Sequence, residues 1–203
     1  KDYKSIGCGE NGGKKISFKI KNTITKTKFD NLVSKLSDDF ELRGIYKSRD
    51  VYLSSGTKRE KLESDFDTNN YAKLLSKKIE VKGYGDVEFE LFRLPEPSKE
   101  LPGGNIRTAE AGILIMGKNN IFENTLFGFK KRNGAPFFHG TLYAPQIDDL
   151  YYEYDENEKN DIEPNKENPI PIIDPSRSGL DRNHPFVNEL VNQIENELTD
   201  IFD

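Results

Sequence analysis

The most apolar part of the chain spans residues 111–145, where short apolar runs alternate with residues that form turns. Residues 113–116 are all apolar, and a run this short is typical of a strand that is buried on both faces. Residues 117–120 contain Gly and Asn, which tolerate a positive φ, so residues 121–129 are predicted to return as the second strand of a hairpin. A third strand is predicted over residues 137–144, and it ends at a proline that cannot donate to a strand ladder.

Apolar and polar residues also alternate at several earlier places, which is typical of half-buried strands. The clearest case covers residues 73–81 and 87–91, and residues 83–86 between them have the composition of a hairpin turn. Residues 56–70 are charged and irregular, with at most a weak helix. Further strand candidates are residues 14–21, 42–46 and 51–53.

Two segments place apolar residues at helical spacing along one face. The first begins at Thr25 or Thr27 as N-cap, and the second begins at Pro185 with Asn183 or His184 as its cap. Their apolar residues are Phe29, Leu32, Val33, Leu36 and Phe40 in the first, and Phe186, Leu190, Val191, Ile194, Leu198 and Ile201 in the second. A short helical turn is also expected at residues 147–150. These elements predict an α+β fold, in which a mixed or antiparallel β-sheet built from hairpins carries two amphipathic helices.

An acidic segment of low complexity covers residues 153–168. It has almost no apolar residues to offset its ordering entropy, so we expect a mobile surface loop. Its carboxylates lack the central Gly of a calcium-binding loop, and no metal site is predicted there. Residues 1–13 are expected to be a glycine-rich leader or the remnant of an upstream domain, with residues 14–203 forming one α+β domain. Because the sequence starts without a Met, we expect a fragment of a longer polypeptide or a processed form.

The composition limits the classes of function. The 203 residues suffice for a sizeable core, and the formal net charge of −5 disfavours a dedicated nucleic-acid surface, which would need clustered Lys and Arg. A nucleic-acid-contacting domain that uses the lysines between Lys14 and Lys28 is kept as a third hypothesis. The lone Cys8 fits a reducing compartment, and no signal peptide or apolar run of bilayer length is present. We therefore expect a soluble cytoplasmic protein.

Motif chemistry identifies no catalytic residue. Residues 7–12 match the Gly-x-Gly-x-x-Gly fingerprint of dinucleotide-binding proteins, but a strand pattern follows where that fingerprint needs a helix N-terminus. The motifs that accompany such a loop in protein kinases do not follow it, and the hydrolase and P-loop motifs are also missing from the sequence. One Cys and two distant His do not have zinc-ligand spacing, so His139 and His184 are predicted to pack or to cap.

The remaining candidates are cationic side chains on loops between strands. Lys130, Lys131 and Arg132 lie at a turn between two apolar strands, and Arg107 lies shortly before the central strand. Basic side chains on such loops are well placed to contact an anion such as a phosphate, although exposed Lys and Arg are more often simply solvated. A turn before the last helix is predicted to pin that helix by ion pairs and capping; its candidate residues are Asp174, Arg177, Gly179, Asp181, Arg182 and His184.

The order of these features resembles the region that follows the ATPase head in the GHKL superfamily, which contains gyrase, heat-shock chaperone, histidine kinase and MutL-type ATPases. The resemblance covers residues 14–203 and rests on residues 40–45, 111–115, 123–127 with Gly140, and above all 176–186. Of two motifs of the head itself, the Asp-x-Gly-x-Gly turn is not present in this sequence. The Glu-x-x-x-Asn spacing occurs only within the acidic segment, at residues 153–157 and 156–160, where a loop is predicted and not the helix that this motif needs.

The resemblance implies a transducer-like domain, which relays the ATP state of an upstream head domain to the rest of the same polypeptide. ATP and Mg²⁺ are then implied for the parent protein, and the fragment alone is not expected to bind or hydrolyse ATP. In the family, a Lys or Arg of this region reaches the terminal phosphate, and the matching candidates are Arg107, Lys130, Lys131 and Arg132. Whether the parent protein is an enzyme is left open.

The alternative is a non-enzymatic protein-interaction module, with a partner protein or a second copy as its ligand. It would use the acidic loop and the C-terminal helix as binding surfaces. This hypothesis predicts an exposed apolar stripe on Phe186, Leu190 and Ile194.

Overall fold

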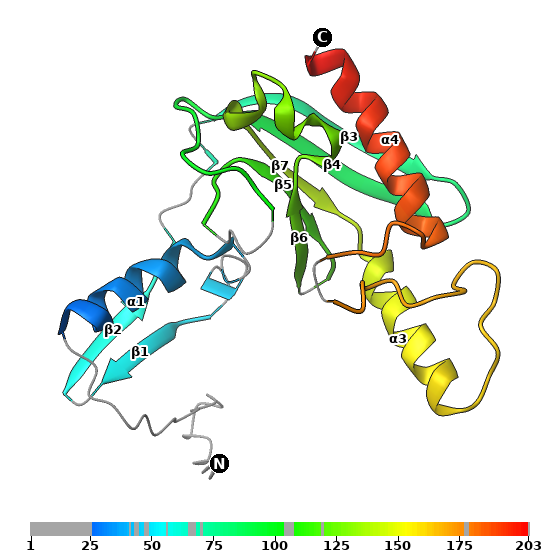
Figure 1. The fold of residues 1–203 in the computed structure, drawn as a ribbon, viewed down its shortest axis with the longest axis horizontal. Helices are drawn as coiled ribbons and strands as arrows, with labels where there is room; N and C mark the ends of the chain where they lie inside the picture. The colour runs from blue at the N-terminus through cyan, green and yellow to red at the C-terminus, as the bar shows by residue number, and fades with distance from the viewer. Residues whose placement is uncertain are drawn as a thin grey trace.

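The computed structural model describes residues 26–40, 42, 45–46, 49–55, 57–64, 68–69, 71–103, 108–118, 120–176 and 179–202 (Figure 1). Within these ranges, three α-helices and two β-sheets confirm the predicted α+β fold. The helices are α1 (Lys26–Asp38), η1 (Phe127–Lys131), η2 (Ala135–Phe137), α3 (Gln146–Lys159) and α4 (Pro185–Phe202), of which η1 and η2 are 3₁₀-helices. The strands are β1 (Val51–Ser55), β2 (Lys58–Leu62), β3 (Ala72–Val81), β4 (Gly85–Arg93), β5 (Gly112–Met116), β6 (Ile121–Thr125) and β7 (Phe138–Tyr143). The glycine-rich leader and the strand predicted at residues 14–21 lie outside the described residues.

Five strands form a mixed sheet in the order β3-β4-β7-β5-β6. The two predicted hairpins are present, since β3 pairs with β4 and β5 pairs with β6, each antiparallel. β7 inserts between these hairpins, antiparallel to β4 and parallel to β5. Gly140 of β7 permits the close approach of both neighbours, because a Cβ atom at this position would lie 2.8 Å from the carbonyl oxygen of Glu90. The apolar stretch that dominates the sequence therefore supplies the middle of the sheet.

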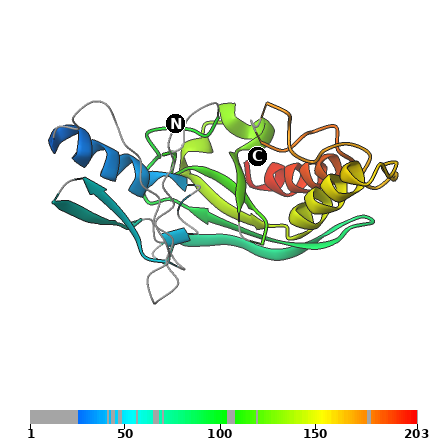
Figure 2. The ribbon, with the colours of Figure 1, turned by 90° about the horizontal axis from the view of Figure 1, so that it is seen from below.

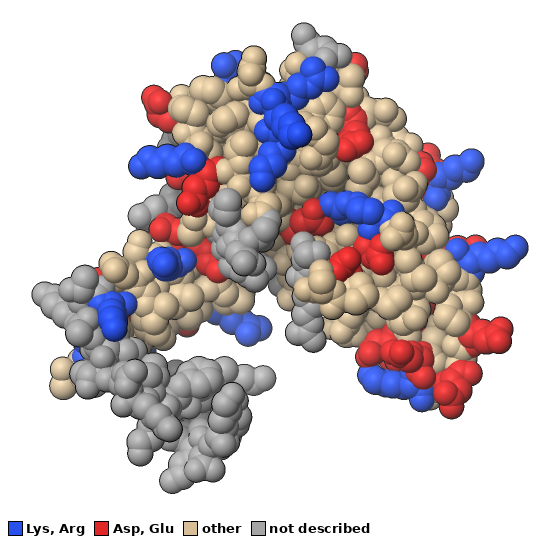
Figure 3. Space-filling model, in the orientation of Figure 1, with Lys and Arg blue, Asp and Glu red and all other residues tan. Residues whose placement is uncertain are grey.

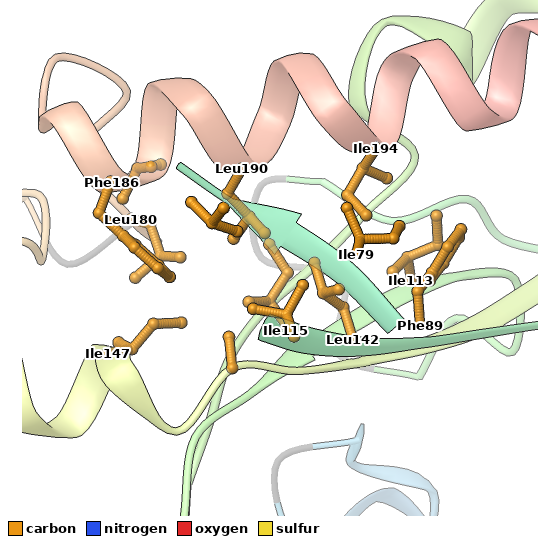
Figure 4. Close-up of a cluster of buried hydrophobic side chains, with 14 of the residues drawn as sticks. Ile79, Phe89, Ile113, Ile115, Leu142, Ile147, Leu180, Phe186, Leu190 and Ile194 are labelled. Carbon is orange, nitrogen blue, oxygen red and sulfur yellow. The ribbon is translucent and has the colours of Figure 1, made fainter. Parts of the chain in front are cut away.

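One face of this sheet is covered by α4, whose apolar stripe points at the strands (Figure 4). Phe186, Leu190 and Ile194 are all 0% exposed, and they pack with side chains such as Ile115 and Leu142 of the central strands. Burying each of these side chains stabilises the fold by roughly 1.5–3 kcal/mol. The exposed stripe predicted by the interaction-module hypothesis is therefore wrong, because the sheet of the same chain covers it.

The first helix packs on a separate two-stranded sheet, in which β1 and β2 are antiparallel. Phe29 of α1 is 3% exposed, so the predicted helix and its buried face are confirmed at this position. The strand predicted at residues 42–46 is wrong for the residues described there, because Leu42, Ile45 and Tyr46 are helical. The Tyr46 hydroxyl donates to the Leu36 carbonyl oxygen at 2.6 Å, which fastens this short helical piece to the end of α1.

The strand β2 lies in the segment predicted to be irregular. Of its five residues, only Leu62 is buried, so no alternation of apolar and polar residues marks it in the sequence. Its charged side chains are held by local contacts instead. Lys61 pairs with Asp50 at 3.0 Å, and the Arg59 guanidinium lies 3.9 Å from the ring centroid of Tyr52 on the partner strand.

The acidic segment is not the loop that was predicted, because its first half continues α3 to Lys159. Asp148 and Asp149 in the first turn interact favourably with the helix dipole, and Lys159 in the last turn pairs with Asp155. Residues 160–168 then return along the helix, where the Asn168 side chain donates to the Leu150 carbonyl oxygen at 2.8 Å. Viewed from below, α3 and α4 lie on the same side of the β3–β4 hairpin (Figure 2).

Candidate anion-contacting site

The candidate site is the basic segment Lys130, Lys131 and Arg132, which ends η1 and leads toward η2 and β7. All three side chains are exposed. Figure 3 shows Lys and Arg side chains gathered over the coils of η1 and η2, at the end of the molecule where α4 terminates. The predicted turn thus contains a pair of short 3₁₀-helices.

The backbone that leads into this segment is strained. Phe127, the first residue of η1, has a φ of 50°, a value that is uncommon for a bulky side chain and costs free energy. Two neighbours hold it there. Leu126 is 2% exposed, and the Thr125 hydroxyl oxygen accepts a hydrogen bond from the Phe127 N–H at 3.0 Å.

The basic segment is fastened to the C-terminal helix. Phe129 of η1 is buried and stacks on Phe202 of α4, with ring centroids 5.0 Å apart and an interplanar angle of 21°. Phe138 of β7 contacts the same ring at a centroid distance of 4.5 Å. The Gly128 N–H donates to a carboxylate oxygen of Glu195 at 3.0 Å. A displacement of η1 would therefore act directly on the last two turns of α4.

Lys130 lies next to the backbone that precedes the other predicted cation. A Cβ atom built on Gly103 would lie 2.8 Å from the Lys130 ammonium nitrogen. The structure thus brings Lys130 to the start of the loop that contains Arg107, but Arg107 itself lies outside the described residues. Neither Lys130 nor Lys131 has an ion pair among the residues that are described, a property they share with other exposed lysines such as Lys166.

The turn before α4 is pinned by a residue that sequence reasoning did not select. Arg182 pairs with Glu123 of β6, and the Leu180 N–H donates to the same carboxylate at 3.2 Å. Gly179 has a φ of 142°, and a Cβ atom there would lie 2.6 Å from a Glu123 oxygen. The contacts that pin this turn thus converge on β6, and Glu123 was not among the candidate residues of the turn, although it lies in the segment 123–127 that carries the resemblance.

The other candidates of this turn have mainly local roles. The Asp174 carboxylate accepts from the Ser176 N–H at 2.7 Å, and the Asp181 carboxylate accepts from the Asn183 N–H at 2.8 Å. These contacts are turn-forming caps of the kind that Asp favours. The predicted Arg177 lies outside the described residues.

His184 is buried at the N-terminus of α4, where it has the capping role that its position predicts. Its Nδ1 accepts from the Phe186 N–H at 3.2 Å, so Nε2 carries the proton and donates to the Asn168 side-chain oxygen at 3.0 Å. Burial lowers the pKa of His184, against an opposing effect of Asp181. The ring is therefore neutral in the folded protein at neutral pH.

His139 is 1% exposed on β7 and has the packing role that was predicted for it. Its Nδ1 donates to the Glu110 carbonyl oxygen at 2.9 Å, and its ring lies 6.5 Å from the ring of Phe92. Within the described ranges, no three side chains of His, Cys, Asp or Glu are grouped so as to hold a metal ion.

Comparison of the chain with protein-family profiles, with curated proteins and with solved structures yields no match. Among the helices that the structure describes, none combines the length and the apolar character needed to cross a membrane.

Proposed function

We propose that this chain is a transducer-like element of a GHKL-type ATP-binding protein, and that its basic segment senses an anion held by an upstream ATPase head. The proposal rests first on the resemblance of residues 176–186, 111–115 and 123–127 to that superfamily. A mixed sheet with β5 and β7 in its middle and an amphipathic helix on one face is compatible with it.

The observation that carries the proposal is the contact between Phe129 and Phe202. A transducer needs a part that meets the nucleotide and a mechanical connection to a distant part. Lys130 and Lys131 are suited to the first role, because fixed cations stabilise negative charge on a phosphoryl group. The aromatic stack and the hydrogen bond from Gly128 to Glu195 are suited to the second. ATP and Mg²⁺ would be held by the head and not by this chain.

The test uses the full polypeptide that contains this chain. We expect the Lys130→Ala, Lys131→Ala double variant to lower the ATP hydrolysis rate at least about tenfold, since removing one electrostatic contact of this type often costs 10²–10³. Lys166→Ala, which removes an exposed ammonium from the segment after α3, is the matched control and should leave the rate unchanged. Equal rates in the double variant and the unmodified protein would reject the proposal.

A second measurement separates the sensing role from the coupling role. By calorimetry, this chain alone should not bind ATP, whereas the full polypeptide should. Phe202→Ala in the full polypeptide should leave ATP affinity intact and weaken the conformational response to ATP, because it removes the connection and not the cations. Nucleotide binding by this chain alone would show that the head is not needed.

A second candidate function is a binding surface on α3. Tyr151 and Tyr152 of α3 are 41% and 58% exposed, and Ile162, which follows the helix, is 55% exposed. Exposed aromatic side chains are enriched at interaction surfaces. These three side chains lie among the carboxylates of the acidic segment, so a basic peptide is the expected ligand. A fluorescent Arg-rich peptide should bind in a salt-dependent manner and should lose affinity on Tyr151→Ser, Tyr152→Ser substitution. Unchanged affinity in that variant would exclude α3 as the surface.

A further inference from the structure

The two edges of the five-stranded sheet differ in whether another segment of the chain lies against them. At one edge, β6 is flanked by the turn before α4. Glu123 of β6 accepts a hydrogen bond from the Leu180 N–H of this turn and pairs with Arg182. At the other edge, β3 pairs with β4, and no described residue pairs with its outer side. An uncovered edge presents unpaired N–H and C=O groups, which are a ready template for another strand.

The helix above the sheet does not close off this open edge. A groove of about 560 Å³ runs between β3 and α4. Its lining residues are Lys77, Lys78, Ile79, Glu80 and Lys82 of the strand side and Glu189, Gln193 and Glu197 of the helix. The side chains of an added strand would therefore have space beside α4.

Lysines on an edge strand usually discourage pairing, but each of the three on β3 has a carboxylate partner within the chain. Lys77 pairs with Glu197 of α4 and Lys73 pairs with Glu90 of β4 at 2.8 Å. Lys78 lies 3.8 Å from Glu88, its cross-strand neighbour. The hydrogen bond from Lys73 lowers the pKa of Glu90, so that pair stays charged well below neutral pH. Each of these lysines thus has a carboxylate nearby in the chain, while Lys78 is 69% exposed, so its charge can also act on an approaching strand.

The charges along the regular part of β3 are complementary to those of a second, antiparallel copy of the same strand. The register with β4 shifts between Lys73 and Leu75 and is then unbroken to Val81. In a symmetric antiparallel pair whose two-fold axis is perpendicular to the sheet, opposite residues share a face, because successive side chains alternate between faces. An axis centred on Ile79 therefore places Lys78 opposite Glu80 of the second copy, and Glu80 opposite its Lys78.

The neighbouring registers are less favourable. An axis centred on Lys78 places this lysine opposite itself, and an axis centred on Glu80 does the same for the carboxylate. Like charges directly opposite each other destabilise a strand pair, whereas opposite charges stabilise it. The register centred on Ile79 also brings two apolar side chains together on the face that carries α4.

We infer that β3 is a self-association edge, through which two copies of this chain join their sheets into one continuous ten-stranded sheet, with Ile79 on the two-fold axis. This assembly is independent of the nucleotide-linked function proposed above. The strand that pairs with β3 is β3 of a second copy, because the charge order Lys78-Ile79-Glu80 is complementary to itself in the antiparallel direction.

Sedimentation equilibrium over a dilution series tests the association directly. The unmodified chain should form a species of about twice 23.2 kDa that dissociates on dilution. A chain that remains at 23.2 kDa up to its solubility limit would overturn the inference.

A charge exchange tests the register. Lys78→Glu and Glu80→Lys should each weaken association by about tenfold or more, because two attractive cross-strand pairs become repulsive. An equimolar mixture of the two variants should associate again, since each negative strand then faces a positive one. Lys166→Glu is the matched control for net charge and should associate like the unmodified chain. Circular dichroism confirms that each variant is folded. Association that is unaffected by the single variants, or not restored in the mixture, would rule out this edge and register.

Discussion

Phe202 in the last turn of α4 stacks on the ring of Phe129, with their centroids 5.0 Å apart, so the C-terminal end of α4 packs against the helix η1 that carries the basic segment. Phe138 borders the same ring at 4.5 Å. The three aromatic side chains come from η1, from the junction between η2 and β7, and from α4. This contact makes the position of Lys130 and Lys131 depend on the position of the C-terminal helix.

We expect Phe202→Ala to destabilise the fold by about 2 kcal/mol, because it removes a half-buried ring and two aromatic contacts without leaving a fully enclosed cavity. The free energy of unfolding in urea measures this loss. Asp200→Ala changes an exposed side chain in the same turn of α4 and is expected to stay within about 0.5 kcal/mol of the unmodified chain. Equal stabilities of the two variants would show that the aromatic contact does not fasten α4.

Below pH 6.5 we expect the chain to lose stability through His184. Burial lowers the pKa of His184 in the folded state, while the unfolded chain keeps a value near 6.5. As the pH falls below 6.5, His184 is protonated in the unfolded state but stays neutral in the folded state, and unfolding becomes more favourable. The contribution of neutral His184 to the free energy of unfolding is complete above pH 6.5. Below that pH it is lost at up to about 1.4 kcal/mol per pH unit.

Urea unfolding at several pH values measures this dependence. His184→Gln is the comparison variant, because its amide does not titrate. Its free energy of unfolding should be lower at neutral pH and should fall less steeply between pH 6.5 and 5. A parallel slope in the two proteins would assign the acid sensitivity to other groups.

The turn before α4 should depend more on Glu123 than on Arg182. The Glu123 side chain is 14% exposed and accepts both from Arg182 and from the Leu180 backbone, whereas Arg182 is 41% exposed. We expect Glu123→Ala to cost about 2 kcal/mol and Arg182→Ala less than about 1 kcal/mol, since an exposed ion-pair partner contributes little. Urea unfolding of both variants provides the comparison. A larger loss for Arg182→Ala would mean that the ion pair, and not the backbone contact, holds the turn.

The elements that the sequence predicts are those whose burial is visible in local periodicity. β5 is an unbroken apolar run because both of its faces are covered, and α4 keeps Phe186, Leu190 and Ile194 at helical spacing because one face meets the sheet. β2 lacks such a pattern, since only Leu62 of that strand is buried. The acidic part of α3 lacks the periodicity of a helix that packs on a core, because its stability comes from Glu-rich helix propensity and from end contacts, not from an apolar face.

Long-range relationships were not predictable in the same way. The local sequence does not predict that β7 lies between the two hairpins, although Gly140 is the residue that permits β4 and β5 to approach β7 closely. The basic segment was found as a turn between strands, but the strain at Phe127 has no sequence signal, because the residue at positive φ is neither Gly nor Asn. The role of Glu123 depends on contacts with Leu180 and Arg182, which lie 57 and 59 residues away in the chain.

Gly140 is the position where the middle of the sheet should be most sensitive to a single methyl group. A Cβ atom there would lie 2.8 Å from the Glu90 carbonyl oxygen and 3.0 Å from the Ile113 side chain. The Glu90 oxygen belongs to the backbone of β4 and cannot move without disturbing its pairing with β7. We expect Gly140→Ala to cost about 3 kcal/mol, at the upper end for overpacking a core.

Gly83→Ala is the matched control. Gly83 lies in the turn between β3 and β4 with a φ of 87°, and nothing lies within 4 Å of a Cβ atom built there. Its substitution should cost only about 1–2 kcal/mol, the strain of a non-glycine residue in the left-handed region. Urea unfolding of the two variants separates steric contact from backbone strain. A smaller loss for Gly140→Ala than for Gly83→Ala would mean that β4 and β7 approach each other less closely than their pairing at Gly140 requires.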